Sequence, residues 1–204
     1  MKLAKPTYNN RITSDFGWRS NGSDYHSGID YGWDRKRGVD SNNFIINISD
    51  GIVKHIGYDS DGWGNYIVMS YGFYFVVYAH LKSVLVVKGK KYPRGYKIAE
   101  MGNTGNSNGK HLHFEIRVCE WEDFFKRYNN GEGRYSVDPE KFYLEYDKRL
   151  ESDLDLTEVN DWEKESWVKA YLSEVNDGVG SNDNVTEGQL MLFFDKLNLI
   201  GGKQ

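Results

Sequence analysis

Apolar and polar residues alternate in short runs over the first 150 residues, and glycine- or asparagine-rich stretches separate the runs. Strands with one buried face show this period of two. Because no helix-period segment lies between the runs, they favour antiparallel pairing over a parallel sheet with crossover helices. The predicted strands are Phe44–Ile48, Gly51–Ile56, Asn65–Ser70, Phe73–His80, Val84–Val87, Lys97–Met101 and His111–Val118. The fold class is therefore predicted to be mainly β.

The pattern changes in the last quarter of the chain. Thr186–Gln189 fits a capping box, and apolar residues at helical spacing follow from Leu190 to Ile200. Residues 1–150 carry 22 Lys+Arg and 18 Asp+Glu, whereas residues 151–204 carry 4 and 12. These differences predict one domain over 1–150 and a small, acidic, helical C-terminal extension over 151–204. The extension either finishes the main domain by packing on it or binds a cell-wall or virion partner.

Composition limits the classes of protein that this chain can belong to. A hydrophobic fraction of 39% with 27% charged residues is ordinary for a folded domain. The net charge of −4 gives no support for nucleic-acid binding, and no apolar stretch is long enough for membrane insertion. The single cysteine, Cys119, excludes an internal disulfide framework and a multi-cysteine zinc site. Met1–Tyr8 lacks the apolar run of a secretory signal, so we expect either synthesis as a soluble cytoplasmic protein or earlier removal of an export segment.

Three of the five histidines fall in two short clusters that suit metal chemistry. They are Tyr25–Asp30 (YHSGID) and His111–Glu115 (HLHFE). In an extended strand, side chains two and four residues apart share a face, so His111 and His113 point the same way, as can His26 and Asp30. Imidazole and carboxylate groups in this number match a zinc site that keeps one position open for water. His26, Asp30 and either His111 or His113 would be the ligands, and the other histidine would act as a base.

The positions of His80, His55 and the loop before His111 predict different roles. His80 ends an apolar strand, where its side chain can face a cleft, whereas His55 lies inside a strand and is best explained as a structural residue. The loop Gly102–Lys110 has the glycine content of a phosphate-binding loop. It lacks the first glycine of a Walker motif and the Ser/Thr after the lysine, so we interpret it as a tight connection to the His111 strand.

These motifs resemble the M23 zinc endopeptidases of the lysostaphin/LytM type. Tyr25–Asp30 is similar to their His-x-Gly-x-Asp signature, and Gly105–Glu115 is similar to their Gly-x-Ser-x-Gly-x-His-Leu-His-Phe-Glu segment. Tyr78–Leu81 matches their Tyr-Ala-His-Leu segment, and Asp138-Pro139 fits their usual closing pair. The resemblance extends over about Arg11 to Tyr143 and leaves the C-terminal extension outside it.

The resemblance implies a zinc ion (Zn²⁺) bound by His26, Asp30 and His113, with His111 and His80 as the catalytic pair. His111 would be the general base and His80 would stabilise the tetrahedral intermediate, although the two roles could be exchanged. The implied substrate is a peptide bond in the cross-links or stem peptides of bacterial peptidoglycan. The implied fold has a groove floored by a β-sheet and walled by loops, here expected at Ser20–Tyr25, Asp59–Gly64 and Glu120–Tyr135.

Two alternatives stay open at this point. One is a non-catalytic peptidoglycan-binding or virion structural protein on the same scaffold, although the complete ligand set weighs against it. The other is a metal-dependent amidase that cuts the link between sugar and peptide. The polar N-terminus further favours a phage or prophage lysin, or a tail-associated lysin, that acts at the bacterial cell wall.

Overall fold

The computed structural model describes residues 3–8, 11–19, 24–33, 43–72, 74–119, 121–125 and 135–144. The predicted helical extension at 151–204 lies outside the described residues, so its helices and its separation from the first domain stay predictions. In the described part of the chain, no helix is long and apolar enough to span a membrane.

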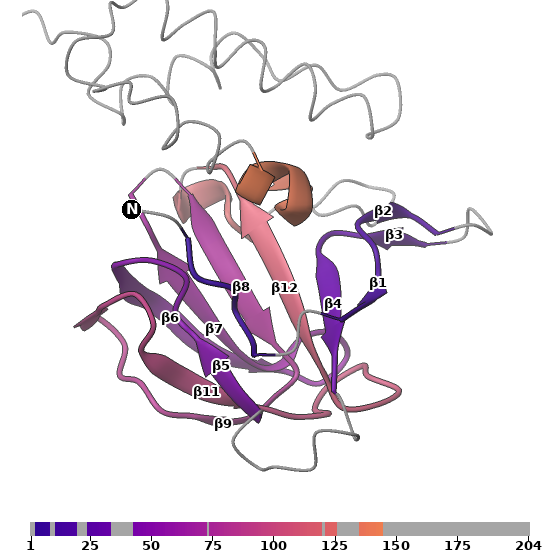
Figure 1. The fold of residues 1–204 in the computed structure, drawn as a ribbon, viewed down its shortest axis with the longest axis horizontal. Coiled ribbons are helices and arrows are strands. Elements are labelled where there is room, and N and C mark those ends of the chain that lie inside the picture. Colours follow the sequence, from indigo (N-terminus) through magenta and orange to yellow (C-terminus); the bar gives the residue numbers. More distant parts are fainter. Residues whose placement is uncertain are drawn as a thin grey trace, which may run out of the picture.

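An antiparallel sheet of eight strands forms the frame of the molecule (Figure 1). Its strands, in spatial order, are β1 (Ile12–Ser14), β4 (Ile29–Gly32), β12 (His111–Arg117), β8 (Phe75–Ala79), β7 (Gly64–Ser70), β6 (Gly51–Asp59) and β10 (Lys91–Tyr92), with β13 (Ser136–Val137) beside β12. Each pairing between these neighbours is antiparallel. The mainly β prediction is therefore confirmed.

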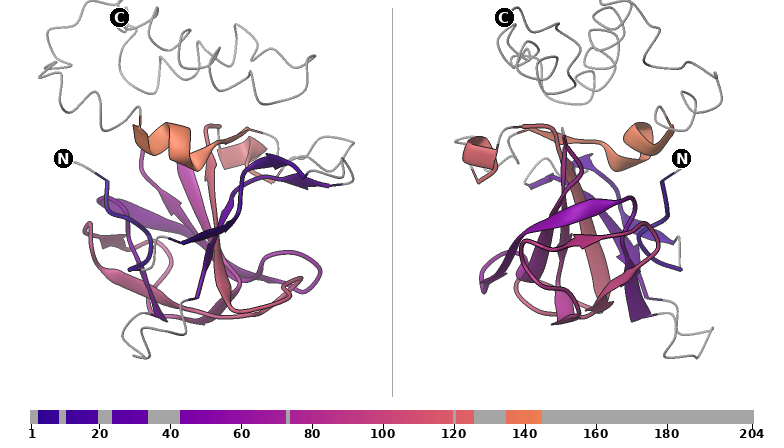
Figure 2. Two further views of the ribbon diagram at one scale, coloured as in Figure 1. Left: turned by 45° about the vertical axis from the view of Figure 1, so that its right-hand side comes forward. Right: turned by 90° about the vertical axis from the view of Figure 1, so that its left-hand side faces the viewer.

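A second sheet of three strands, in the order β5 (Phe44–Ile46), β11 (Lys97–Met101) and β9 (Leu81–Val84), shares its core with one face of the large sheet (Figure 2). Side chains such as Ile45 and Ile98 from the small sheet join Met69 and Phe114 from the large sheet in this core. A separate pair, β2 (Gly17–Trp18) and β3 (Tyr25–His26), lies near β1. The two-sheet arrangement leaves the other face of the large sheet available for a site.

The predicted strands agree with the structure except at Val84–Val87. There the strand is β9, at Leu81–Val84, because its partner β11 aligns Glu100 with Ser83. Val84 and Val86 pack in or against the core while Leu85 and Val87 are exposed, so the alternation is present, but the strand itself ends at Val84. The short strands β1 to β4, β10 and β13 were not predicted. Two to four residues give too little alternation for a period to be recognised.

Alternation along β12 separates the two faces of the large sheet. Leu112, Phe114 and Ile116 point into the core between the sheets. Their neighbours His111, His113, Glu115 and Arg117 lie on the opposite face, because successive side chains of a strand point to opposite sides. On that face an aromatic cluster of Trp63, Tyr66, Phe75 and Phe124 covers the far end of the strands. The histidines are therefore held on a strand whose two faces are both packed.

Candidate metal centre

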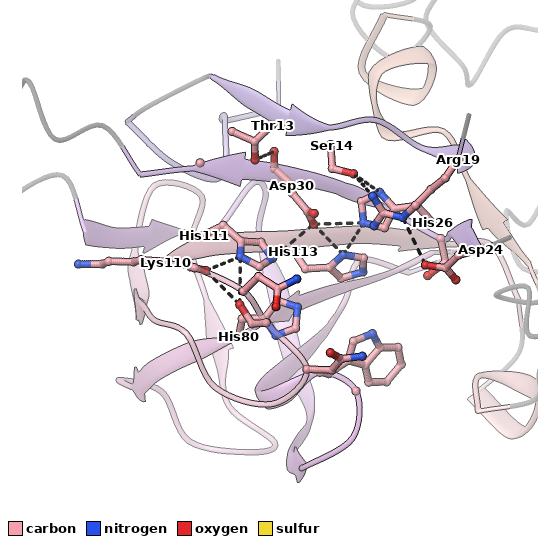
Figure 3. Close-up of a pocket in the computed structure, with 18 of the residues that line it drawn as sticks. Thr13, Ser14, Arg19, Asp24, His26, Asp30, His80, Lys110, His111 and His113 are labelled. Carbon is pink, nitrogen blue, oxygen red and sulfur yellow. Dashed lines mark hydrogen bonds and ion pairs between the residues drawn. The ribbon is translucent and has the colours of Figure 1, made fainter. Parts of the chain in front are cut away.

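Three side chains converge on one point, as predicted. His26 Nε2 lies 3.1 Å from Asp30 Oδ1 and 3.0 Å from His113 Nδ1, and His113 Nδ1 lies 3.1 Å from Asp30 Oδ1. Figure 3 shows the three groups pointing toward one another from β3, β4 and β12. Three ligands of a tetrahedral ion with bonds of 2.0–2.1 Å would lie roughly 3.3 Å apart. The spacing therefore fits three corners of a small tetrahedral metal ion.

The outer nitrogen of each ligand imidazole is already engaged. His26 Nδ1 donates to the backbone carbonyl of Asp15 at 2.6 Å, and His113 Nε2 faces the Glu115 carboxylate at 3.4 Å. Where each ring is neutral and uses its one N–H outward, each inner nitrogen presents a lone pair. Two such lone pairs 3.0 Å apart repel each other unless a proton or a metal cation lies between them. The orientation of the two rings therefore favours a bound cation, which would displace the proton that His113 otherwise holds.

The charges around the ligands also favour a cation. Burial by itself raises the pKa of Asp30, but hydrogen bonds with His113 and His26 outweigh it and hold that pKa well below its usual range. Burial by itself lowers the pKa of His113, yet its hydrogen bonds with Asp30 and Glu115 raise it to about 9. Both carboxylates are therefore ionised, and together they stabilise positive charge at this position.

A bend between β3 and β4 brings His26 and Asp30 together. The two residues do not belong to one continuous strand, because the strand is interrupted at Ser27 and Gly28. At Gly28 a Cβ atom would lie 2.5 Å from the Phe114 carbonyl oxygen and 2.9 Å from His113 Cε1. Only glycine permits this close approach of the bend to β12. The glycine of the motif is therefore a packing requirement of the metal centre.

The two other predicted histidines lie beside the ligands. His111 Nδ1 donates to the Gly109 carbonyl at 2.7 Å, and His111 Nε2 lies 3.7 Å from Asp30 Oδ1. The ring of His80 lies beside that of His111, with centroids 4.6 Å apart. His80 Nδ1 donates to the Thr104 carbonyl at 2.8 Å. In the neutral tautomer that these bonds select, Nε2 is the nitrogen of each ring that carries the lone pair.

His80 is held in an unusual backbone conformation. Its φ of 58° lies in the left-handed region, which side-chain-bearing residues seldom adopt. The surroundings fix it there: its N–H donates to the Trp63 carbonyl at 2.8 Å, and Thr104 Oγ1 donates to the Leu81 carbonyl at 2.9 Å. Burial lowers the pKa of His80 to about 4, so the imidazole is neutral at neutral pH. Strain of this kind concentrates at functional sites.

All five predicted site residues line one open cleft with a volume of about 580 Å³. Its walls include Asp24 and Tyr25 on one side and Asp61, Gly62 and Trp63 on another, as expected for two of the three predicted loops. The third predicted loop, Glu120–Tyr135, lies largely outside the described residues. The segment from Asn106 to Lys110 forms a further wall that was not predicted as such. The cleft is open enough to admit an extended peptide.

A buried ion pair behind the ligands was not predicted. Glu115 is completely buried; its Oε2 accepts from Ser27 Oγ at 2.9 Å, and its Oε1 accepts from Ser136 Oγ at 2.6 Å and from Arg117 Nε. The Arg117 guanidinium also donates to the Phe124 carbonyl and lies 5.1 Å from the Trp63 ring. The same two-residue spacing that places His111 and His113 on one face was the signal that could have revealed Glu115 and Arg117.

His55 and Cys119 lie outside the metal centre. The His55 ring stacks on Tyr66 with centroids 5.6 Å apart, and Cys119 packs against the aromatic cluster next to it. Neither residue lines the cleft. The position of His55 agrees with the structural role expected for it, and Cys119 acts as a small packing residue.

Comparison with known proteins places this arrangement in context. Residues 24–130, more than half of the chain, match Peptidase family M23. Peptidoglycan DD-endopeptidase ShyA of Vibrio cholerae is 48% identical over 56 residues, which are 27% of this chain and 13% of that protein. Murein hydrolase activator NlpD of Escherichia coli is 42% identical over 74 residues, which are 36% of this chain and 19% of that protein. The chain thus spans less than a fifth of the length of these curated relatives.

A solved structure supports the same fold. Lysostaphin from Staphylococcus simulans superposes with a TM-score of 0.52 at 24% identity, over 67% of this chain and 50% of that chain. This likeness concerns the fold of the antiparallel sheet and carries no information about activity.

Proposed function

The chain belongs to peptidase family M23, and on that premise we propose that it is a zinc-dependent endopeptidase acting on peptide bonds in the cross-links or stem peptides of bacterial peptidoglycan. The observation that carries the proposal is the convergence of His26 Nε2, Asp30 Oδ1 and His113 Nδ1 within 3.0–3.1 Å of one another. Two imidazoles and one carboxylate are ligands that zinc prefers in catalytic sites with three protein ligands.

A zinc ion bound by these three side chains would lower the pKa of a water molecule to about 7 and polarise the substrate carbonyl. Among the chain's own residues, His111 acts as the general base, because its Nδ1 is held by the Gly109 carbonyl and its Nε2 lies 3.7 Å from Asp30 Oδ1. His80 is neutral in the resting protein, so it stabilises developing negative charge only after it has taken up a proton. The two histidines adjoin each other, and their roles could be exchanged.

The substrate class follows from the cleft and from the relatives. The cleft is open and lined by backbone and polar side chains, which suits an extended peptide more than a small apolar ligand. One relative is named a peptidoglycan DD-endopeptidase, and its matching segment supports a peptidoglycan peptide as the substrate here. The phage or prophage origin expected from the N-terminus stays a prediction.

A second candidate function is a non-catalytic regulator of wall hydrolysis. It is favoured by the 42% identity to a protein named murein hydrolase activator. The complete set of His26, Asp30, His113, His111 and His80 in one cleft weighs toward an enzyme. The two functions differ in whether new ends are generated in purified peptidoglycan.

The test is digestion of purified peptidoglycan by the full chain, with bound zinc quantified in the same sample and products identified by mass. We expect about one zinc per chain and products in which a peptide bond has gained water. His113→Ala should abolish both, whereas His55→Ala, which removes a histidine outside the cleft, should leave both unchanged.

Three outcomes separate the competing functions. Bound zinc without any product would support the regulator and contradict the enzyme. Water gained at the link between sugar and peptide would indicate an amidase. Undiminished hydrolysis by His113→Ala would refute the ligand assignment.

A further inference from the structure

A concentrated basic segment lies far from the cleft along the sheet. Between Asp61 and Glu100 the chain contains six Lys or Arg and no Asp or Glu, although its overall net charge is −4. Four of these cations fall within seven residues: Lys88, Lys90, Lys91 and Arg94, which we call the basic surface. All four are exposed. The positive charge is therefore a local feature that the composition of the whole chain conceals.

In the described part of the chain, the side chains of the basic surface form no ion pair with an acidic side chain, although the Asp50 carboxylate lies beside the Arg94 backbone. Two nearby lysines are engaged elsewhere: Lys82 pairs with Glu100 at 3.0 Å, and Lys97 Nζ lies 4.1 Å from the Phe44 ring centroid. Among the described residues, the side chains of the basic surface form no such ion pair. Burial and the charge of Lys88 both lower the pKa of His55 on the neighbouring strand. The charge of Lys88 therefore acts on a side chain of β6.

The backbone that carries these cations is anchored. Lys91 pairs with Ile52 across β10 and β6, and the Gly89 N–H donates to the Val53 carbonyl at 2.8 Å. The Arg94 N–H donates to Asp50 Oδ1 at 2.9 Å. The amide of buried Asn47 donates to the Tyr92 and Pro93 carbonyls. Because the chain is fixed at these points, the four charges are presented along one sheet edge at set spacings, which lowers the entropy lost on binding.

The edge position keeps the basic surface away from the metal centre. Strand β10 ends the large sheet, and β8, β7 and β6 separate it from β12. Four strand spacings of about 4.8 Å place it roughly 20 Å from the His113 strand. A ligand bound there would leave the cleft open.

We propose that the basic surface binds a linear phosphodiester polyanion that carries no bases, and thereby holds the protein on an anionic envelope. Lysine binds phosphate as a point charge, and three of the four cations are lysines. Single-stranded nucleic acid fits less well, because the nearby Tyr92 and Tyr96 rings contact each other, with centroids 4.9 Å apart, instead of forming a platform for bases. Anionic phospholipid is the competing ligand, because apolar side chains are also exposed beside the cations, namely Ile52, Leu85, Val87 and Tyr96, and vesicles are therefore included in the test.

The test measures binding of the full chain to fluorescein-labelled poly(glycerol phosphate) by anisotropy, at salt concentrations from 20 to 150 mM. The variant Lys90→Gln/Lys91→Gln/Arg94→Gln removes three charges from the basic surface. The matched control Lys5→Gln/Arg11→Gln/Lys141→Gln removes three exposed charges elsewhere and gives the same net charge. We expect at least a tenfold loss of affinity at 50 mM salt for the first variant, with the slope of log affinity against log salt flatter by about two. The affinity of the control variant for the polymer should stay within about twofold of that of the parent chain.

Several results would overturn the proposal. These are no binding by the parent chain, equal losses in the two triple variants, or equal affinity for a polycarboxylate of the same charge density. Tighter binding to a single-stranded oligonucleotide, or binding only to anionic phospholipid vesicles, would do the same. Hydrolysis of a soluble peptide substrate should be unchanged in both variants, which makes this test independent of the proposed peptidase activity.

Discussion

Replacing Arg117 by methionine tests whether the buried ion pair behind the metal ligand supports the fold. The Arg117 and Glu115 side chains are 1% and 0% exposed. Without the guanidinium, Glu115 would keep only its hydrogen bonds with Ser27, Ser136 and His113. Removing one partner of such a pair leaves an uncompensated buried charge, which costs about 3–5 kcal/mol. Against a total stability of about 5–15 kcal/mol for a domain, Arg117→Met should still fold, with a much smaller margin.

Urea unfolding followed by circular dichroism measures this loss, with separate series in excess zinc and in chelator so that the contribution of the metal is known. Arg19→Met is the matched control, because Arg19 pairs with Asp24 at 3.3 Å on the surface, where such a pair contributes at most about 1 kcal/mol. The double variant Glu115→Gln/Arg117→Met removes both charges. It should be more stable than Arg117→Met alone, with a coupling energy of about 2 kcal/mol between the sites.

The reasoning fails if Arg117→Met costs no more than Arg19→Met. It also fails if the double variant loses the sum of the two single losses, because independent contributions would mean that the pair does not act as a unit. A related readout is zinc affinity, which should fall tenfold or more in Glu115→Gln, because the carboxylate orients His113.

Three further predictions concern the site. With free zinc at a thousand times its dissociation constant, the free energy of unfolding should be about 4 kcal/mol higher than in chelator. Thermal melts in the two media measure this difference, which should vanish in Asp30→Ala. Gly28→Ala should destabilise the chain by about 2 kcal/mol or more, because the added Cβ would meet the Phe114 carbonyl. In Gly109→Ala the added Cβ would have no neighbouring atom within 4 Å, so this control should cost less than about 1 kcal/mol in the same urea assay. Thr104→Val should lower the free energy of unfolding by about 1–3 kcal/mol, because the Asn65 N–H loses its acceptor. Peptide hydrolysis should also slow, because the hydroxyl that bonds the Leu81 carbonyl next to His80 is lost. Unchanged stability would contradict this role.

Much of the fold could be predicted because β12, β8, β7 and β11 are apolar or alternating runs that are long enough to be recognised as strands. His111 and His113 lie on one face of β12, as their two-residue spacing predicts for a strand. The shift of β9 and the short strands β1 to β4 could not be predicted, since their limits depend on which neighbour each strand pairs with.

The sequence by itself determined the residue types and the local spacings of the site: His26 with Asp30, His111 with His113, and a histidine at the end of β8. The tertiary structure alone decided how they meet. The bend at Ser27 and Gly28 and the pairing of β4 with β12 bring residues 83 positions apart to 3.1 Å. The carbonyls of Asp15, Gly109 and Thr104 select the ring nitrogens that face the cleft. Every residue has a backbone carbonyl, so no residue type in the sequence identifies these three carbonyls as acceptors. Only the fold shows which backbone carbonyls the histidine rings reach.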